Sequence, residues 1–255
     1  MGRIIVIANQ KGGVGKTTTA INLSAYIAIK KKRVLLIDMD PQGNASGGFD
    51  IDPSSVTKTV YDVMLGEASI EDTIISNVRP KLSIVPSDVN LAAAEIQLSD
   101  VPDKNHILKK ELGKIRDKYD YMIMDCPPSL NILTINSMCA ADSVIVPLQC
   151  EYYALEGLAQ LMQTVSLIQE RENDRLRIEG IVFTMYDGRT NLATQVVENV
   201  TQNTDKKIYK CIIPRNVRLA EAPSYGMPIT EYDPKSSGAK AYEKLASKVI
   251  HYRRT

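Results

Sequence analysis

Short and nearly continuous apolar runs recur along this chain of 255 residues, and they constrain its fold more than any other feature. Such runs lack the alternation of half-exposed strands, so they are typical of strands buried on both faces of a parallel sheet. We expect strands of this kind at residues 4–8, 34–37, 82–85, 121–124, 144–147, 181–185 and 208–213.

Longer segments with helical periodicity lie between these runs. We expect helices at residues 18–30, 91–98, 107–118, 155–171, 192–200 and 239–252. The alternation predicts an α/β fold, a doubly wound and mostly parallel sheet flanked by helices, with a site at the carboxyl ends of the strands. Residues 46–80 are less regular, with one short helix at 60–65, and we expect them to form an insertion beside that site within a single domain spanning residues 1–255.

The composition is that of an ordinary globular protein, with 44% hydrophobic and 24% charged residues. The formal net charge of +1 gives the whole chain no strong field for nucleic acid or an anionic membrane, so any such surface must be local. No secretory signal and no run of membrane-spanning length is expected. The four cysteines have no CxxC spacing and the chain has only two histidines, which argues against a structural zinc site and favours the reducing cytoplasm.

A glycine-rich loop follows the first predicted strand and precedes the first predicted helix. This arrangement places backbone N–H groups around a phosphate, with Lys16 reaching the β and γ phosphates and Thr17 completing a Mg²⁺ shell. A simple glycine turn is the alternative, and the general GxxxxGK[ST] pattern is not met because its first glycine would fall on Gln10. The predicted nucleotide-binding residues of this P-loop are Lys11, Gly12, Gly13, Val14, Gly15, Lys16, Thr17 and Thr18.

Three acidic residues follow predicted strands at the same edge of the sheet. Asp38 and Asp40 end the second strand, and Asp125 ends the run at 121–124. Acids after strands are often helix caps, and a lone apolar run ending in Asp is a weak pattern. Beside a phosphate loop, however, they predict Mg²⁺ binding by Thr17, Asp38 and Asp125, with Asp40 orienting the attacking water.

Taken together, the segments KGGVGKTT, DMDPQGN and DCPPS resemble the ParA/Soj chromosome and plasmid partition ATPases, in the superfamily that includes MinD. Residues 149–157 and 213–223 resemble later segments of the same family, so the resemblance spans almost the whole chain. It implies ATP and Mg²⁺ as cofactors and a homodimer with two ATP molecules between its subunits. The catalytic residues would be Lys11, Lys16 and Asp40, with Lys11 contacting the partner's phosphates, while Pro214 and Asn216 would lie near the adenine.

The resemblance also implies a cytoplasmic, nucleoid-associated protein that binds double-stranded DNA without reading its sequence. Arg189 and Arg218 match the positions expected to touch DNA phosphates, and dimerisation would double the number of such contacts. A ParB-type partner would stimulate hydrolysis and so release the DNA. Further cations that would widen this surface are Lys206, Lys207, Lys210, Arg215, Lys235 and Lys240.

Two other functions remain as alternatives on the same scaffold. A MinD-like division-site ATPase would reach a membrane through a C-terminal amphipathic helix, but residues 246–255 are basic and lack a bulky apolar face. An iron protein of the nitrogenase type would need cysteines shared across a dimer, and Cys126 and Cys139 are expected to be core residues.

Overall fold

The computed structural model describes residues 1–252, and within them it contains one seven-stranded sheet with the strand order β3-β4-β2-β5-β1-β6-β7. All neighbouring strands are parallel except the edge pair of β3 and β4. The strands are β1 Arg3–Ile7, β2 Val34–Asp38, β3 Ile75–Arg79, β4 Leu82–Val85, β5 Tyr121–Asp125, β6 Ser143–Gln149 and β7 Arg177–Thr184. The predicted doubly wound, mostly parallel sheet is confirmed.

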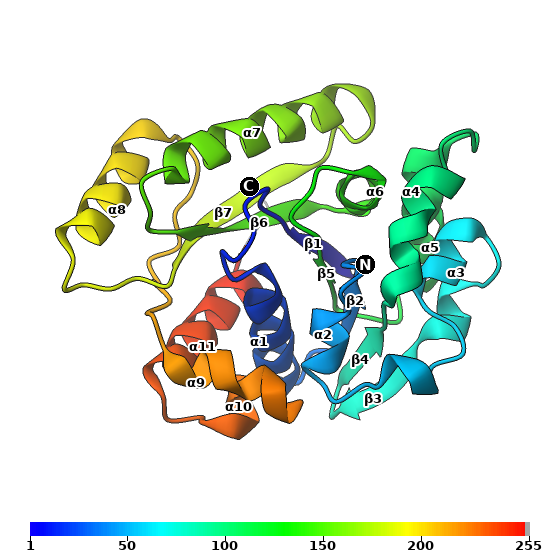
Figure 1. Ribbon diagram of the computed structural model, residues 1–255, viewed down its shortest axis with the longest axis horizontal. Helices are drawn as coiled ribbons and strands as arrows, with labels where there is room; N and C mark the ends of the chain where they lie inside the picture. Colours follow the sequence, from blue (N-terminus) through cyan, green and yellow to red (C-terminus); the bar gives the residue numbers. More distant parts are fainter. Residues whose placement is uncertain (253–255) are drawn as a thin grey trace.

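The sheet separates two apolar layers because successive side chains of a strand point to opposite faces. On β1, Ile4 and Val6 pack with residues of α3 and α5 to α8, whereas Ile5 and Ile7 pack with α1 and α11. Figure 1 shows this division, with α1, α9, α10 and α11 gathered on one side of the sheet and α7 covering β6 and β7 on the other.

Most helices lie where the periodicity predicts them, within a few residues. The α-helices are α1 Lys16–Ile29, α2 Asn44–Gly47, α3 Val60–Leu65, α4 Ala94–Gln97, α5 Ile107–Ile115, α6 Ile132–Ala140, α7 Ala154–Arg171, α8 Asn191–Asn203, α9 Val217–Glu221, α10 Ile229–Tyr232 and α11 Ser237–Ile250. Short 3₁₀ turns are η1 Pro53–Ser55, η2 Ile70–Thr73, η3 Val89–Ala93, η4 Lys104–His106 and η5 Ala222–Tyr225. Among residues 1–252, no helix is both long and apolar enough to cross a membrane.

Local chemistry accounts for helix ends such as those of α3. Thr59 and Asp62 form a reciprocal capping box at its start, where the backbone N–H of Thr59 donates to the Asp62 carboxylate at 2.7 Å. Gly66 ends the helix with a φ of 75°, a conformation that glycine adopts without a steric penalty. The short helix predicted inside the irregular segment is therefore confirmed.

One predicted strand is wrong, and one observed strand was missed. Residues 208–213 make only isolated bridges, at Ile208 and at nearby Pro214, because this segment is an edge connection beside β7 and not a full ladder. β3 was missed because its sequence ISNVR is a partly exposed edge strand with no continuous apolar run. α6 was missed because it is buried on nearly every side, which removes the amphipathic periodicity of a surface helix.

Candidate nucleotide site

The loop between β1 and α1 is held in a conformation that only glycine adopts easily. Gly13 and Gly15 have φ values of 74° and 86°, in the left-handed region. Between them, the Val14 carbonyl accepts a 2.8 Å hydrogen bond from the Thr184 hydroxyl at the end of β7. The ends of β1 and β7, two strands with β6 between them, therefore fix the course of this loop at the carboxyl edge of the sheet.

The N-terminus of α1 has no side-chain cap. Gly15 occupies the capping position, the first turn contains no acidic residue, and the first intrahelical bond runs from the N–H of Thr19 to the carbonyl of Gly15. The preceding N–H groups have no partner in the helix, and the helix dipole adds partial positive charge to them. This geometry is suited to a phosphate group.

Lys16 brings a full positive charge to the same place. It is buried, with 7% of its surface exposed, and its Nζ donates to the Lys11 carbonyl at 3.0 Å. Burial lowers the pKa of this amine, while the nearby Asp125 opposes that shift. The ammonium is thus held inside the loop, where a phosphate would supply its counter-charge.

Lys11 points to a different partner within its own chain. Its ammonium forms an ion pair with Glu151, just after β6, and both side chains are partly exposed. The backbone N–H of Lys11 donates to the Asn9 side-chain oxygen at 3.0 Å, and Asn9 in turn donates to the Pro147 carbonyl at 2.7 Å. The backbone of Lys11 is fixed, whereas its ammonium is held by one exchangeable ion pair.

The two acids after β2 differ in their surroundings. The fully buried Asp38 carboxylate accepts from the backbone N–H and the hydroxyl of Ser46, both at 2.8 Å. Burial outweighs these bonds and raises the pKa of Asp38 to about 6. Asp40 accepts a 3.0 Å bond from the N–H of Gln42 through Oδ1, and its other oxygen makes no hydrogen bond with the described residues.

Asp125 is the least satisfied polar group of the site. Both carboxylate oxygens are fully buried, and neither makes a hydrogen bond of normal geometry within residues 1–252. Burial raises its pKa well above the usual range, the neighbouring Asp38 raises it further, and the Thr17 hydroxyl opposes the shift. A buried carboxylate without a partner is costly, and a divalent cation would compensate it. The donor set of Thr17, Asp38 and Asp125 therefore fits Mg²⁺.

Two adjoining cavities form a continuous trough along this edge of the sheet. The first, of about 710 Å³, is lined by the P-loop, Asp40 and the segment 127–131. The second, of about 670 Å³, lies between the ends of β7 and the segment 213–220. Gly15, Thr18 and Met185 line both. The first cavity, the polar half of the trough, has the dimensions for phosphates. The second cavity, the apolar half, has those for a nucleoside.

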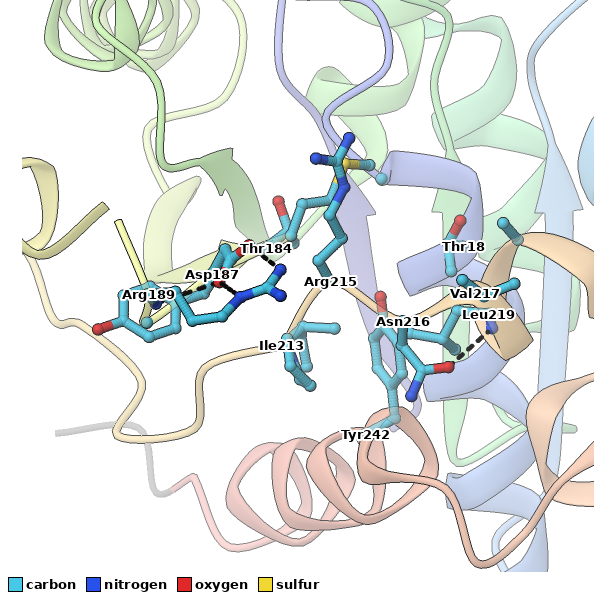
Figure 2. Close-up of a pocket in the computed structure, with 16 residues that line it drawn as sticks. Thr18, Thr184, Asp187, Arg189, Ile213, Arg215, Asn216, Val217, Leu219 and Tyr242 are labelled. Carbon is cyan, nitrogen blue, oxygen red and sulfur yellow. Dashed lines mark hydrogen bonds and ion pairs between the residues drawn. The ribbon is translucent and has the colours of Figure 1, made fainter. Parts of the chain in front are cut away.

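Pro214 and Asn216 both line the apolar half, as the family resemblance implies. The Asn216 side chain caps the start of α9, since its oxygen accepts from the N–H of Leu219 at 3.3 Å (Figure 2). Its amide donates to the Ser237 hydroxyl at 2.9 Å. A contact of Asn216 with adenine stays a prediction, because both ends of this amide already have protein partners.

The two arginines predicted to touch DNA lie beside acidic side chains, and Arg189 also lines the apolar half. Arg189 pairs with Asp187 at 2.6 Å, and Arg215 also acts electrostatically on this carboxylate. The pKa of Asp187 falls to about 2, chiefly because Arg189 hydrogen-bonds to it. Arg218 pairs with Glu221 at 2.9 Å. Both guanidinium groups remain exposed, but each one is partly neutralised within its own chain.

Three residues in or beside the trough had no assigned role from sequence. Glu151 holds Lys11, Thr184 anchors the P-loop, and Met185 lines both cavities with a φ of 50°. Glu151 follows a predicted strand and Thr184 lies near the carboxyl end of another, so the general rule about strand ends could have drawn attention to them. The backbone conformation of Met185 has no sequence pattern that would predict it.

The AAA domain family matches residues 2–178. Over 249 residues the chain is 52% identical to the sporulation initiation inhibitor protein Soj of Bacillus subtilis, with 98% of each chain covered. It is also 50% identical over 250 residues to the chromosome partitioning protein ParA of Caulobacter vibrioides, covering 97% of this chain and 94% of that one. The chain belongs to the ParA/Soj family. The resemblance drawn from its motifs is confirmed.

Solved structures outside the immediate ParA/Soj relatives share the fold. A cobyrinic acid a,c-diamide synthase from Mycobacterium smegmatis, solved with a bound ATP analogue and magnesium, is 34% identical, with a TM-score of 0.87 and coverage of 98% and 95%. The cell division ATPase MinD of Pyrococcus furiosus is 28% identical, with a TM-score of 0.81 and coverage of 98% and 99%. The P-loop ATPase fold predicted for this ParA/Soj chain is therefore confirmed.

Proposed function

We propose that this chain is an ATP hydrolase that converts ATP and water to ADP and phosphate with Mg²⁺ as cofactor. One observation carries the proposal: the uncapped start of α1, the buried Lys16 and the unpartnered Asp125 meet at the polar end of a nucleotide-sized trough. The solved relative with an ATP analogue and magnesium supports the same assignment.

The P-loop residues bind and orient the triphosphate. The backbone N–H groups at the start of α1 donate to phosphate oxygens, and Lys16 adds charge at the β and γ positions. Thr17, Asp38 and Asp125 would hold Mg²⁺, which when bound neutralises charge on the phosphates. Asp125 then stays ionised without the cost of an unpaired buried charge.

Asp40 orients the attacking water. It lies in the lining of the polar cavity, and the oxygen that does not bind Gln42 is free to accept a hydrogen bond from water. A positioned acceptor of this kind directs the water's lone pair toward the γ-phosphorus and contributes on the order of 10²–10⁴-fold to the rate.

ATP binding also drives formation of a homodimer in this proposal. Lys11 leaves Glu151 and contacts the phosphates of the partner subunit, in the manner of an arginine finger. A partly exposed ion pair is worth only about 0–1 kcal/mol, so the exchange of Glu151 for a triphosphate is favourable. Lys11 therefore needs no ligand other than the nucleotide to leave Glu151.

The dimer is proposed to act in DNA partition in the cytoplasm, on the nucleoid. Arg189 and Arg218 would bind phosphates of double-stranded DNA without sequence preference, and a ParB-type partner would stimulate hydrolysis and release. The partition role is supported by the names of the Caulobacter vibrioides and Treponema pallidum relatives, which are 50% and 49% identical. DNA binding by the dimer is compatible with a net charge of only +1 per chain, because dimerisation concentrates cations on one surface.

The MinD-like alternative has less support from the geometry. The apolar residues of α11, including Leu245 and Val249, are buried against α1 and its neighbours, so this face is not free for lipid. Residues 253–255 of the basic C-terminal segment lie outside the described residues. The iron-protein alternative needs thiols at a surface shared with a second subunit, and both Cys126 and Cys139 are buried inside their own subunit.

Two substitutions test the assigned chemistry. Lys16→Ala is expected to weaken ATP binding on the order of 100-fold, since it removes a charge-assisted contact from a buried phosphate. Asp40→Ala is expected to keep the ATP-dependent dimer, seen by light scattering, while turnover falls about 100-fold or more. The control is Asp117→Ala, an exposed acid beyond α5. Normal turnover in Asp40→Ala would refute its role in positioning water.

A further inference from the structure

A second cluster of metal-binding side chains lies outside the nucleotide trough. His106 is the last residue of η4, Cys139 lies near the end of α6, and Glu172 directly follows α7. Their ligand atoms, one from each residue, all lie within 4.8 Å of one another. The three residues are 33 positions apart in each step along the chain, so no local spacing could reveal the cluster.

The spacing of these atoms is close to that of a tetrahedral site. His106 Nε2 and Glu172 Oε2 are 3.5 Å apart. Bond lengths of about 2.0–2.2 Å from Zn²⁺ to nitrogen and oxygen place two tetrahedral ligands roughly 3.4 Å from each other. The Cys139 sulfur needs an approach of about 1 Å, which rotation of the His106 and Glu172 side chains would supply, since both are partly exposed.

The outer neighbours of the cluster orient its ligands. Asp103 Oδ1 binds Nδ1 of His106 at 2.7 Å, which leaves Nε2 directed at Glu172. Asn105 donates to Oε1 of Glu172 at 2.9 Å and so leaves Oε2 facing His106. Metal-binding histidines in proteins usually donate their second ring nitrogen to a carboxylate in this way.

The three chain segments are also fixed to one another. Asn136, on α6, donates to the Lys104 carbonyl at 2.7 Å and accepts from the N–H of Leu108 at 3.3 Å. Asn173, just after Glu172, donates to the carbonyls of Met138 and Ala141 at 2.9 and 2.8 Å. The backbone positions of all three ligands are thus set by buried side-chain bonds to α6.

We propose that His106, Cys139 and Glu172 form a binding site for a borderline divalent transition metal of the Zn²⁺ class. The imidazole, thiolate and carboxylate are the three protein ligands, and water occupies the fourth position on the exposed side. Cys139 releases its thiol proton to solvent when the metal binds. This proposal departs from the expectation that a structural zinc site is improbable, because that expectation considered only local spacing and the three ligands come from distant segments.

The location gives the metal a structural role. α6 begins at Asn131, in the lining of the phosphate cavity, and Cys139 lies eight residues further on, about 12 Å along the helix axis. A metal would bind α6 to the end of α7 and to the start of α5. It would stabilise the helical layer behind the phosphate cavity without touching the nucleotide.

Without a metal, the same residues have an ordinary explanation: the His106 ring lies between Asp103 and Glu172, and Cys139 is a core thiol. Co²⁺ distinguishes the two, since a bound thiolate gives a near-ultraviolet charge-transfer band and tetrahedral Co²⁺ gives intense visible bands. The full-length protein, stripped with a chelator and free of nucleotide, is titrated with Co²⁺ and then with Zn²⁺.

We expect one equivalent of Co²⁺ to produce both bands, Zn²⁺ to remove them, and millimolar Mg²⁺ to leave them unchanged. Cys139→Ser is expected to lose the charge-transfer band, and His106→Gln to bind Co²⁺ at least tenfold more weakly. Asp103→Asn, which alters only the orienting partner, is expected to cost about 10–100-fold in affinity. The matched control Cys211→Ser, a buried thiol in the opposite apolar layer, keeps both bands.

Absence of a charge-transfer band in the unsubstituted protein would overturn the proposal, as would its persistence in Cys139→Ser. His106→Gln changes a partly exposed side chain, so its far-ultraviolet circular dichroism should match that of the unsubstituted protein. The readout is independent of ATP turnover and therefore of the proposed function.

Discussion

Asp125 and Asp38 are fully buried carboxyl groups that adjoin each other beside the P-loop. Burial raises the pKa of both, that of Asp38 to about 6. The folded protein therefore holds these protons more tightly than the unfolded chain does. The stabilisation linked to the bound protons is complete below the ordinary carboxyl pKa, and it is lost as the pH rises through the raised values. Without Mg²⁺, the pair destabilises the fold at neutral pH.

Asp125→Asn is expected to stabilise the nucleotide-free, Mg²⁺-free protein. It removes a buried charge that makes no hydrogen bond, so we expect a gain of about 1–3 kcal/mol at alkaline pH that shrinks as the pH falls and the native carboxyl takes up its proton. Thermal unfolding as a function of pH measures this difference. Addition of Mg²⁺ and ATP should make the unsubstituted protein the more stable of the two, because only it gains a bound metal. The same order of stability in both conditions would contradict the role assigned to Asp125.

Among the elements, the segment 207–214 depends on a close contact with β7. A Cβ built on Gly180 of β7 would come within 2.7 Å of the Tyr209 ring. Tyr209 cannot move aside easily, because it is 1% exposed and its hydroxyl donates to the buried Glu179 at 2.8 Å. This contact keeps the segment beside β7 and leads the chain to Pro214 and the apolar half of the trough.

Gly180→Ala is therefore expected to destabilise the protein by about 1–3 kcal/mol through overpacking. Gly113→Ala is the matched control, and it is expected to change the stability in the opposite direction. Gly113 is exposed in the middle of α5, a Cβ there meets nothing within 4 Å, and the gain in helix propensity is about 0.5–1 kcal/mol. Chemical denaturation of both variants measures the two effects. Equal stabilities for the two variants would show that Tyr209 has more freedom than its contacts indicate.

Sequence reasoning succeeded for elements whose pattern is local. The central strands are continuous apolar runs, and α3 carries its own capping residues, so both were predicted closely. The P-loop and its acids were predicted because a strand end, a glycine loop and a helix start stand next to one another in the chain. The contacts of Lys11 with Glu151 and of Thr184 with Val14 join residues more than a hundred positions apart, and no local pattern contains that information.

For the whole molecule, the proposed function depends on a second copy of the chain. Alone, the subunit keeps Lys11 paired with Glu151 and its two predicted DNA-binding arginines paired with nearby acids. The proposed dimer would bring two such surfaces together, which would raise the number of phosphate contacts and make DNA affinity depend on ATP. The single-domain organisation over residues 1–255 stays a prediction.

Arg218→Glu is expected to keep ATP turnover within about twofold of that of the unsubstituted protein and to weaken DNA binding. Because the dimer carries two copies, removal of two phosphate contacts should reduce the slope of log affinity against log salt by about 2. Lys118→Glu is the matched charge reversal, at an exposed lysine just before β5 and away from the trough. A loss of binding as large in Lys118→Glu would mean that net charge, and not position, governs the interaction.

We propose that ATP gates a sequence-independent DNA-binding dimer, and fluorescence anisotropy with an arbitrary labelled duplex tests this directly. The purified protein is titrated with ATP and Mg²⁺, and separately with ADP and Mg²⁺, across a salt series. We predict binding with ATP that falls steeply with salt and is at least tenfold weaker with ADP. Absence of DNA binding with either nucleotide, in a protein that measurably hydrolyses ATP, would contradict the account.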